Sequence, residues 1–231
     1  MIAHRREGIR AWPVISGDLR RVLDVGCGTG DALDRAGTEF LAVGIDIDHD
    51  ALRSGSKLFP RCRLSRATGE ALPFKDASFD AVLSRVALPY MNLPIALEEI
   101  ARVLRHGGEV WLAFQRFAFV RSELMKSLRT VNAQHAVFLC YVILNGLVFH
   151  FLGRTFRFPL NPRFCESFQT ERGIRRALAR AGFADIRIAE TSPFIVTAQR
   201  AEDPRAASPS SGPSPGSPDR QIAGRARRRG A

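Results

Sequence analysis

The stretch Val22-Leu23-Asp24-Val25-Gly26-Cys27-Gly28-Thr29-Gly30 decides the fold of this chain. It predicts a short apolar strand, residues 21–25, that runs into a glycine-rich turn and then into a helix beginning near Asp31. Glycines at alternate positions remove Cβ atoms where the backbone has to turn sharply and approach a ligand closely. A loop of this kind at the C-terminal end of a strand is where an open parallel sheet binds small molecules. We therefore expect a ligand-binding loop, and not a tight turn that only connects two elements.

Acidic residues around the loop indicate which ligand it binds. Asp24 precedes the turn, and Asp31 occupies the sixth position, where a dinucleotide-binding G-x-G-x-x-G loop has glycine. Carboxylates there disfavour a pyrophosphate and favour a ligand with a cationic end, such as an amino acid moiety or a sulfonium. With its D-x-G-x-G-x-G pattern the sequence resembles the class I S-adenosylmethionine (SAM)-dependent methyltransferases, specifically the methyltransferase type 11 domain family. The resemblance implies SAM as the cofactor and a binding loop of Asp24, Gly26, Cys27, Gly28 and Gly30, in which Cys27 is a small side chain that fits.

A second apolar strand, residues 40–45, ends in Asp46-Ile47-Asp48. Asp46 lies 22 positions after Asp24. An ionised carboxylate about 20 residues past the glycine loop can accept both hydroxyls of a ribose. The resemblance places the ribose-binding acid at Asp46, with Ile47 beside it. Asp48 and Asp50 are expected at the N-terminus of the next helix, where acids favour the helix dipole.

Residues 67–74 (Ala-Thr-Gly-Glu-Ala-Leu-Pro-Phe) resemble the family's G-D-A-E-x-L-P-F motif, and Ser78-Phe79-Asp80 follows them. The resemblance implies that Thr68, Gly69 and Glu70 line the adenine pocket. Thr68 stands where the family usually has an aspartate facing the adenine amino group. A neutral hydrogen bond is roughly half as strong as a charge-assisted one. We therefore expect weaker discrimination of adenine, without loss of binding.

The fourth predicted strand, residues 80–86, should end beside the methyl donor, since function lies at the C-terminal ends of such strands. Ser84 is a predicted cofactor contact there, and Tyr90 either positions the acceptor or forms a wall of the pocket. An amphipathic helix, residues 95–104, is expected to end with Gly107 as a left-handed cap, before a fifth strand over residues 110–114. Its Arg-Val-Leu-Arg-His-Gly-Gly end resembles the family's R-V-L-K-P-G-G, with His106 in place of proline.

Four family motifs thus occur in order over residues 21–114. A helix begun by Thr170 and two closing strands, residues 185–189 and 194–199, are expected further along the chain. Together these elements predict an α/β fold of the Rossmann-like methyltransferase kind. Its seven-stranded sheet should be mostly parallel with an antiparallel C-terminal hairpin, and should carry helices on both faces. We expect this domain to occupy residues 1–200, with a short helix over residues 3–11 and a helical insert at 115–169.

The insert is the part that a minimal domain would lack. It predicts a helix over residues 121–129 and an apolar run over 136–144, which Asn145 and Gly146 interrupt before the run resumes at 147–152. A helix that is apolar on every face is either buried or in lipid, and the interrupted run is shorter than the roughly 20 residues that a span needs. A lid over the active site, membrane-surface contact through residues 131–157 and a true span all remain open. His135 and His150 join Tyr90 as candidate catalytic residues, although a histidine beside an apolar run is also often a core residue, and no catalytic base is established.

Composition bounds the remaining alternatives. The formal net charge is +11, but residues 201–231 contribute six Arg against three acids, and they lack the apolar periodicity that folding needs. We expect a disordered basic tail there. Nucleic acid is a disfavoured partner, because no Asn-Pro-Pro-Tyr motif follows the fourth strand and no RNA-binding module is recognisable. The four cysteines lack paired spacing and the N-terminus is too polar for a signal peptide. Both features predict a cytoplasmic protein, with a position peripheral to the inner face of a membrane as the alternative.

The sequence as a whole predicts a SAM-dependent methyltransferase that acts on a small, apolar acceptor such as a quinone, a lipid or a secondary metabolite, without a metal ion. The alternatives are an RNA methyltransferase and a catalytically silent SAM-binding accessory protein. The oligomeric state is left open.

Overall fold

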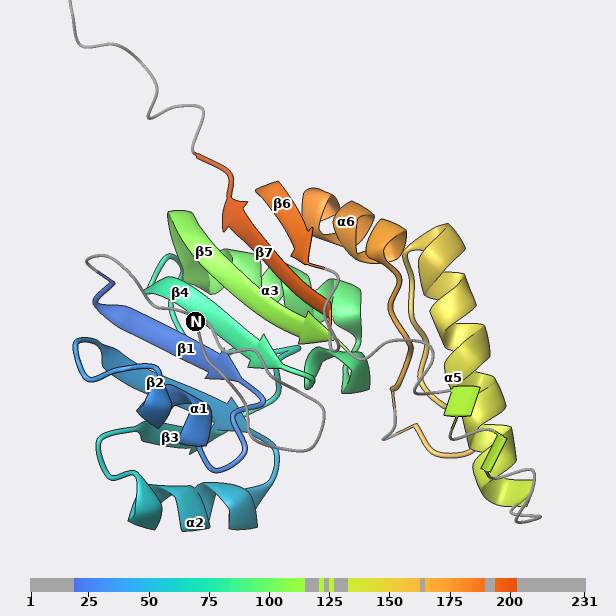
Figure 1. The fold of residues 1–231 in the computed structure, drawn as a ribbon, viewed down its shortest axis with the longest axis horizontal. Helices are drawn as coiled ribbons and strands as arrows, with labels where there is room; N and C mark the ends of the chain where they lie inside the picture. The colour runs from blue at the N-terminus through green and yellow to red at the C-terminus, as the bar shows by residue number, and fades with distance from the viewer. Residues whose placement is uncertain are drawn as a thin grey trace, which may run out of the picture.

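A seven-stranded sheet in the order β3-β2-β1-β4-β5-β7-β6 organises the computed structural model (Figure 1). The structure describes residues 19–114, 121–122, 125–126, 133–162, 165–189 and 194–202. The predicted helix over 3–11, most of the one over 121–129 and the tail from residue 203 lie outside these ranges. The strands are β1 (Arg21–Val25), β2 (Leu41–Asp46), β3 (Arg63–Arg66), β4 (Phe79–Arg85), β5 (Leu104–Phe114), β6 (Phe183–Ala189) and β7 (Phe194–Arg200). The helices are α1 (Asp31–Arg35), α2 (His49–Leu58), the 3-10 helix η1 (Leu88–Tyr90), α3 (Leu93–Val103), α5 (Ala133–Leu152) and α6 (Glu171–Arg180).

The strand pairing confirms the predicted fold. β1 pairs in parallel with β2 on one side and with β4 on the other, while β3 and β5 extend the parallel part outward. β7 runs antiparallel to both β5 and β6 and so forms the closing hairpin. The chain leaves β1 toward β2 and returns on the far side at β4, which makes the β1–β4 pair the point where the strand order reverses. Ligands of open α/β sheets bind outside the carboxyl ends of strands at such a point.

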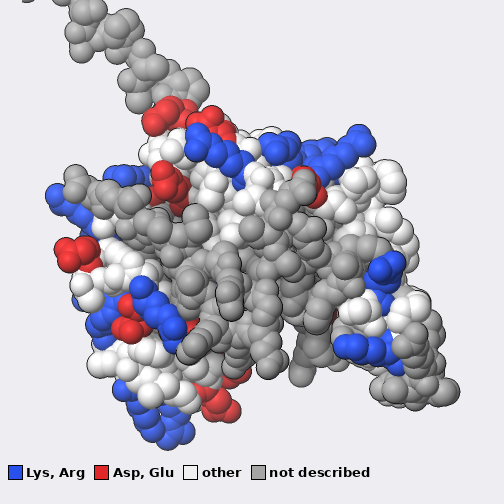
Figure 2. All heavy atoms as spheres, viewed as in Figure 1, with Lys and Arg blue, Asp and Glu red and all other residues white. Residues whose placement is uncertain are grey.

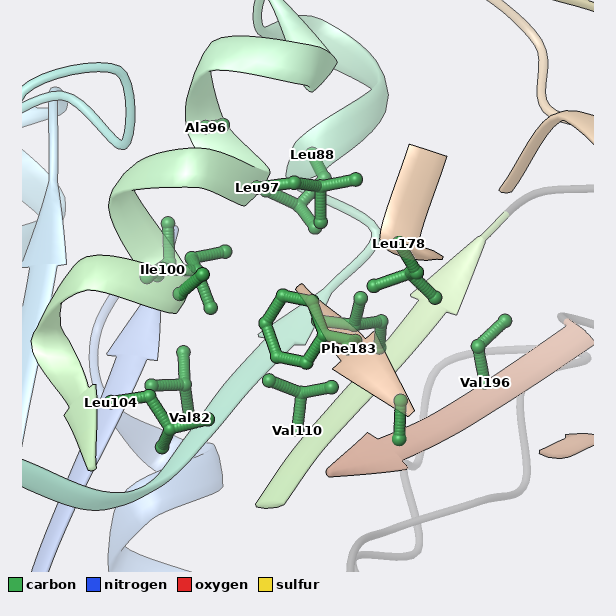
Figure 3. Close-up of a cluster of buried hydrophobic side chains, with 14 of the residues drawn as sticks. Val82, Leu88, Ala96, Leu97, Ile100, Leu104, Val110, Leu178, Phe183 and Val196 are labelled. Atoms are coloured by element: carbon green, nitrogen blue, oxygen red, sulfur yellow. The ribbon is translucent and has the colours of Figure 1, made fainter. Parts of the chain in front are cut away.

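Uninterrupted apolar runs form the central strands because both faces of the sheet are covered. On one face Leu97 and Ile100 of α3 lie over Val82 of β4 and Val110 of β5 (Figure 3). On the other face α1 covers a second buried cluster, to which it contributes Leu33. The motifs predicted from the sequence therefore sit on a rigid, doubly covered sheet.

The prediction that Gly107 caps α3 is wrong, although the predicted end of this helix at residue 104 is one residue from the observed end. Gly107 does have a left-handed backbone, with φ of 69°, but α3 ends at Val103 and Leu104 is already extended. Leu104 is fully buried and aligns with Phe79 of β4, so tertiary pairing ends the helix before the glycine is reached. The glycine turn lies within the segment assigned to β5.

The predicted interruption of the insert at Asn145 and Gly146 is also wrong, because α5 is one continuous helix of 20 residues (Figure 1). Asn145 is fully buried, and its amide nitrogen donates to the carbonyl oxygens of Phe156 at 3.1 Å and Glu166 at 2.8 Å. A Cβ at Gly146 would lie 2.2 Å from the Phe168 ring. Both residues are therefore packing positions against the segment that follows the helix, and not helix breakers.

Candidate functional site

A cavity of about 480 Å³ opens at the carboxyl ends of β1, β2 and β4. This volume is within the range of small-molecule sites. Six of the residues predicted from the sequence line it, namely Gly26, Asp46, Ile47, Thr68, Glu70 and Tyr90. The lining also includes Ile45, Ala67, Arg85, Val86, Ala87, Met91 and Arg157. The cavity lies where the strand order reverses, as expected for this class of sheet.

Asp46, at the end of β2, connects the cavity to the glycine loop. Its Oδ2 accepts from the backbone N–H of Gly28 at 2.8 Å, and its Oδ1 accepts from that of Asp48 at 2.9 Å. Each carboxylate oxygen retains a further lone pair, so the group can still accept two hydroxyl protons from a ribose. The two backbone donors fix the orientation of the carboxylate in advance. Asp48 lies at the N-terminus of α2, as predicted: it is the N-cap, and its carboxylate accepts from the backbone N–H groups of Asp50 and Ala51.

The glycine loop lies very close to the end of β4. A Cβ at Gly26 would lie only 2.1 Å from the Cβ of Ala87, and the Gly26 φ of 77° is itself unfavourable for other residues. At Gly28 a Cβ would meet no heavy atom within 4 Å, at a φ of 55°. The first glycine is therefore required by packing, whereas the second leaves open space above the loop.

Asp24 lies beneath this loop and outside the cavity lining. Its side chain is buried, and its Oδ1 has no hydrogen-bond partner among the described residues. Burial raises the pKa of the Asp24 carboxyl from 3.8 to about 7, while the Arg85 guanidinium lowers it and the carboxylates of Asp31 and Asp46 raise it. An unsatisfied buried carboxyl is costly, and a cationic group placed above it would stabilise its ionised form. This feature fits the amino group of an amino acid moiety.

Glu70 links the adenine-side loop to the insert. Its Oε1 accepts from the backbone N–H of Asn92 at 2.5 Å, and its Oε2 accepts from the Arg157 guanidinium at 2.7 Å. Two further contacts join the return segment, residues 153–169, to the same edge: Thr155 Oγ1 donates to Asn92 Oδ1 at 3.3 Å, and the Ser167 N–H donates to the carbonyl of Pro89 at 3.1 Å. The return segment is thus part of the site.

The remaining wall of the cavity is largely apolar. Val86, Ala87 and Met91 follow β4 and line the cavity together with Tyr90, which is half exposed. Val86 has a φ of 59°, which is rare for a β-branched residue. Strained backbone of this kind often occurs at functional sites. Val86, Ala87 and Met91 bring no charge to this part of the wall.

Other predicted cofactor residues support the site from outside the cavity lining. The Ser84 hydroxyl is buried and donates to the carbonyl of Val25 at 2.8 Å, so it joins β4 to β1. Cys27 is buried, and burial raises the pKa of its thiol, which agrees with a packing role. Gly30 and Gly69 are close-packed against Leu64 and Met91. Direct contact of these residues with a cofactor stays a prediction.

The two candidate histidines lie away from the cavity. His150 Nδ1 is 2.7 Å from the hydroxyl of Thr170, the residue that caps α6, and His135 lies in the first turn of α5. Neither lines the cavity. Tyr90 is the one candidate catalytic side chain that does, and its role in catalysis stays a prediction.

Arg85 and Arg157 are the polar lining residues that sequence reasoning missed. Arg85 ends β4 and its guanidinium lies 3.1 Å from Asp31 Oδ1. Arg85 could have been predicted, because it directly follows Ser84 and the end of β4 was expected at the site. Arg157 had no such signal, since 71 positions separate it from Val86 and only folding of the insert brings it to the cavity.

Comparison with known proteins shows the fold and a family match over part of the chain. Residues 23–112 match the family described as a methyltransferase domain. The chain is 38% identical to the malonyl-[acyl-carrier protein] O-methyltransferase of Erwinia pyrifoliae over 104 residues, which cover 41% of this chain and 37% of the relative. It is 36% identical to the ubiquinone/menaquinone biosynthesis C-methyltransferase of Bartonella bacilliformis over 138 residues, which cover 54% and 51%.

The chain thus spans about half or less of the length of these curated relatives. Among solved structures, a SAM-dependent methyltransferase from Methanosarcina mazei superposes with a TM-score of 0.55 at 20% identity, over 82% of this chain and 95% of that one. At that identity the likeness shows the fold alone. Residues 23–112 match the methyltransferase domain family, and the sheet that carries them has the class I SAM-dependent methyltransferase fold.

Proposed function

We propose that this protein is a SAM-dependent methyltransferase that methylates a small, apolar acceptor. One observation carries the proposal: the cavity at the ends of β1, β2 and β4 combines the Asp46 carboxylate with an apolar wall formed by Val86, Ala87 and Met91. The first feature suits a ribose and the second suits an acceptor without charge. The relative from Bartonella bacilliformis, described as acting in quinone biosynthesis, supports an acceptor of the quinone or lipid type.

The residues present fit the cofactor. Asp46 would hold the ribose hydroxyls, the Thr68 and Glu70 loop would face the adenine, and the buried Asp24 carboxyl would lie beneath the amino acid end. Bound SAM would supply a methyl group on a positively charged sulfur: an acceptor oxygen, carbon or nitrogen would attack the methyl carbon in line as the methyl–sulfur bond breaks and the sulfur leaves as a neutral thioether. Because the methyl group is already activated, the protein has mainly to orient both reactants and exclude water.

Three features of the chain would serve that task. The rigid glycine loop and the pre-oriented Asp46 carboxylate fix one reactant. The apolar wall excludes water from the space beside it, which strengthens the remaining polar contacts. Arg157, tied to Glu70, closes the adenine side with a side chain from the insert. We assign no general base, and Tyr90, which lines the cavity, would either orient an acceptor or form part of the wall.

The proposal is tested by incubating the full chain with SAM labelled in its methyl group, together with a bacterial lipid extract or with RNA. We expect enzyme-dependent label in the organic phase, and its loss in the Asp46→Ala variant. Label that is found in RNA would contradict the acceptor class. Binding of SAM without transfer to any fraction would favour a silent accessory protein.

A further inference from the structure

Helix α5 has one face that is anchored in the domain. Tyr141 and Val142 are buried in a cluster with Phe168, and the Tyr141 hydroxyl donates to the carbonyl of Phe156 at 2.7 Å. Phe149 is fully buried in the main core. At the C-terminal end, the Arg176 guanidinium donates to the carbonyls of Phe149 and Phe151, both at 3.0 Å, and so satisfies groups that a helix end leaves without partners.

The opposite face of α5 is an exposed apolar stripe. It consists of Val137, Cys140, Leu144, Leu147 and Phe151, which follow one another at intervals of three and four residues. This spacing puts them in one line along a helix. Leu144 is 55% exposed and Phe151 67% exposed, and Leu152 beside it is 62% exposed. A contiguous apolar surface of this kind marks an interaction site on a protein.

The segment of sequence that contains the stripe carries charge of one sign. Residues 124–165 contain five Lys or Arg and no Asp or Glu. Arg154 is exposed two residues after the helix ends. Figure 2 shows white and blue atoms on the lobe that α5 forms. An apolar stripe in a basic segment is complementary to anionic lipid headgroups above acyl chains.

The packing of α5 argues against a transmembrane orientation. Its length and composition alone would suffice to cross a bilayer, and with the helix uninterrupted the sequence-based length argument no longer excludes it. However, spanning would detach Asn145 and Tyr141 from the carbonyls that they bind and would strand these groups in hydrocarbon, at several kcal/mol each. Only one face is free to meet lipid.

A second copy of the chain is a poorer fit to the stripe. A 20-residue helix is about 30 Å long and about 10 Å wide, so one face offers roughly 300 Å². Specific protein interfaces bury about 800 Å² per partner. Two copies would also bring two basic segments together.

We propose that the stripe of α5 docks on the surface of an anionic membrane, with the helix axis in the plane of the interface and the stripe among the first acyl carbons. This inference does not depend on the proposed methyl transfer. The docked helix would hold the return segment, and through Arg157 the cavity, next to a pool of apolar molecules.

Vesicle sedimentation of the full chain without SAM tests the proposal. We expect partition onto vesicles of phosphatidylcholine mixed with phosphatidylglycerol, weaker partition onto phosphatidylcholine alone, and release by high salt. Leu144→Glu should lower the partition coefficient at least about ten-fold, because it puts a charge in place of a leucine that the docked helix would bury among the acyl chains. The matched control is Leu58→Glu, at an exposed leucine of α2 that is 66% exposed, and it should bind as the unaltered protein does.

Arg154→Glu provides an independent variant that leaves the apolar face intact. It should weaken binding to the anionic vesicles at least about five-fold, at about 1 kcal/mol per charge near the surface, and leave binding to neutral vesicles unchanged. Unchanged partition of Leu144→Glu would overturn the proposal and assign binding to another segment such as the basic tail. Protein that stays with the membrane after alkaline carbonate extraction would indicate that α5 spans the bilayer. A dimer that Leu144→Glu abolishes would indicate that the stripe binds a second copy of the chain. Either result would also overturn the proposal.

Discussion

The carboxyl edge of the sheet and the insert meet at one cavity, but different interactions stabilise the two regions. At the sheet edge, backbone geometry dominates: Gly26 touches Ala87 closely, and backbone N–H groups hold the Asp46 carboxylate. In the insert, side chains dominate, since Asn145 and Tyr141 bind the backbone of the return segment while an apolar stripe faces outward. The first arrangement tolerates little change, whereas the second can vary at its exposed face without unfolding.

This difference suggests a division of roles. The sheet edge carries the groups that suit a cofactor, and the insert contributes Arg157 and the surface near which an acceptor would approach. Substitutions at the sheet edge should therefore change SAM affinity and stability. Substitutions in the insert should change transfer to the acceptor and leave SAM affinity nearly constant.

The largest effect is expected for Gly26→Ala. The added Cβ would overlap with Ala87, which costs about 1–3 kcal/mol by overpacking, and the left-handed backbone adds about 1–2 kcal/mol. We expect urea denaturation to show a loss of about 2–5 kcal/mol and calorimetry to show no SAM binding.

Gly28→Ala is the control for stability, because its Cβ would meet no heavy atom within 4 Å. It should lose only about 1 kcal/mol, the cost of its left-handed backbone. Equal losses in the two variants would show that the close approach to Ala87 is not the constraint.

Asp24→Asn should change the pH dependence of stability. The folded-state pKa of Asp24 is raised to about 7, so the native state binds more protons than the unfolded state between about pH 4 and pH 7, and stability falls as the pH rises through that window. A shift of this size corresponds to an upper bound of about 4 kcal/mol. The asparagine variant should therefore gain stability over the unaltered protein at pH 8 but not at pH 4.

The same substitution should weaken SAM binding, because it removes the carboxyl beneath the amino acid end. SAM binding to the unaltered protein should strengthen from pH 6 to pH 8 and release protons in calorimetry with different buffers. If Asp24→Asn is no more stable than the unaltered protein at pH 8 and binds SAM with the same affinity, Asp24 neither sets the pH dependence of stability nor contributes to SAM binding.

Arg157→Gln tests the link between insert and site at a smaller scale. Arg157 is 48% exposed in its side chain, so its ion pair with Glu70 contributes only about 0–1 kcal/mol. We expect kcat/KM for the acceptor to fall about three- to five-fold while the Kd for SAM changes less than two-fold. Arg154→Gln, an exposed arginine of the same segment, should change neither value with a soluble acceptor. A larger effect on SAM than on the acceptor would contradict the division of roles.

Thr68→Asp should have the smallest effect. It restores the aspartate that the family usually has opposite the adenine amino group, and a charge-assisted bond gains about 0.5–1 kcal/mol over a neutral one. SAM affinity should rise about two- to five-fold in a competition assay. Weaker binding would mean that repulsion from the nearby Asp46 and Glu70 carboxylates dominates at this corner.

Local patterns predicted the sheet edge well. Apolar runs and alternate glycines located β1 and β2, the caps at Asp48 and Thr170 marked the starts of α2 and α6, and the distance from the glycine loop marked Asp46. These features depend on short-range rules of backbone geometry. The sequence did not reveal that Asp46 also binds the N–H of Gly28, since that contact forms only when β1 and β2 are paired.

The insert was predicted less well because its structure depends on distant contacts. Asn145 and Gly146 have low helix propensity, but each is accommodated by a particular partner in the return segment, and propensity is overridden by such packing. For the same reason Gly107 was misjudged as a helix cap, as pairing of Leu104 with β4 ends α3 earlier. Arg157 enters the site only through the fold of the insert.

The central claim is that Asp46 makes this sheet edge a SAM site, and calorimetric titration of SAM into three proteins tests it most directly. The unaltered chain should bind SAM, and Asp46→Ala should weaken binding by about 10- to 100-fold, as expected for charged hydrogen bonds of about 1.5–3 kcal/mol. Asp48→Ala removes a neighbouring carboxylate that caps α2, so it should lose about 1 kcal/mol of stability and keep the affinity of the unaltered chain. Equal SAM affinity in Asp46→Ala and the unaltered chain would contradict the account.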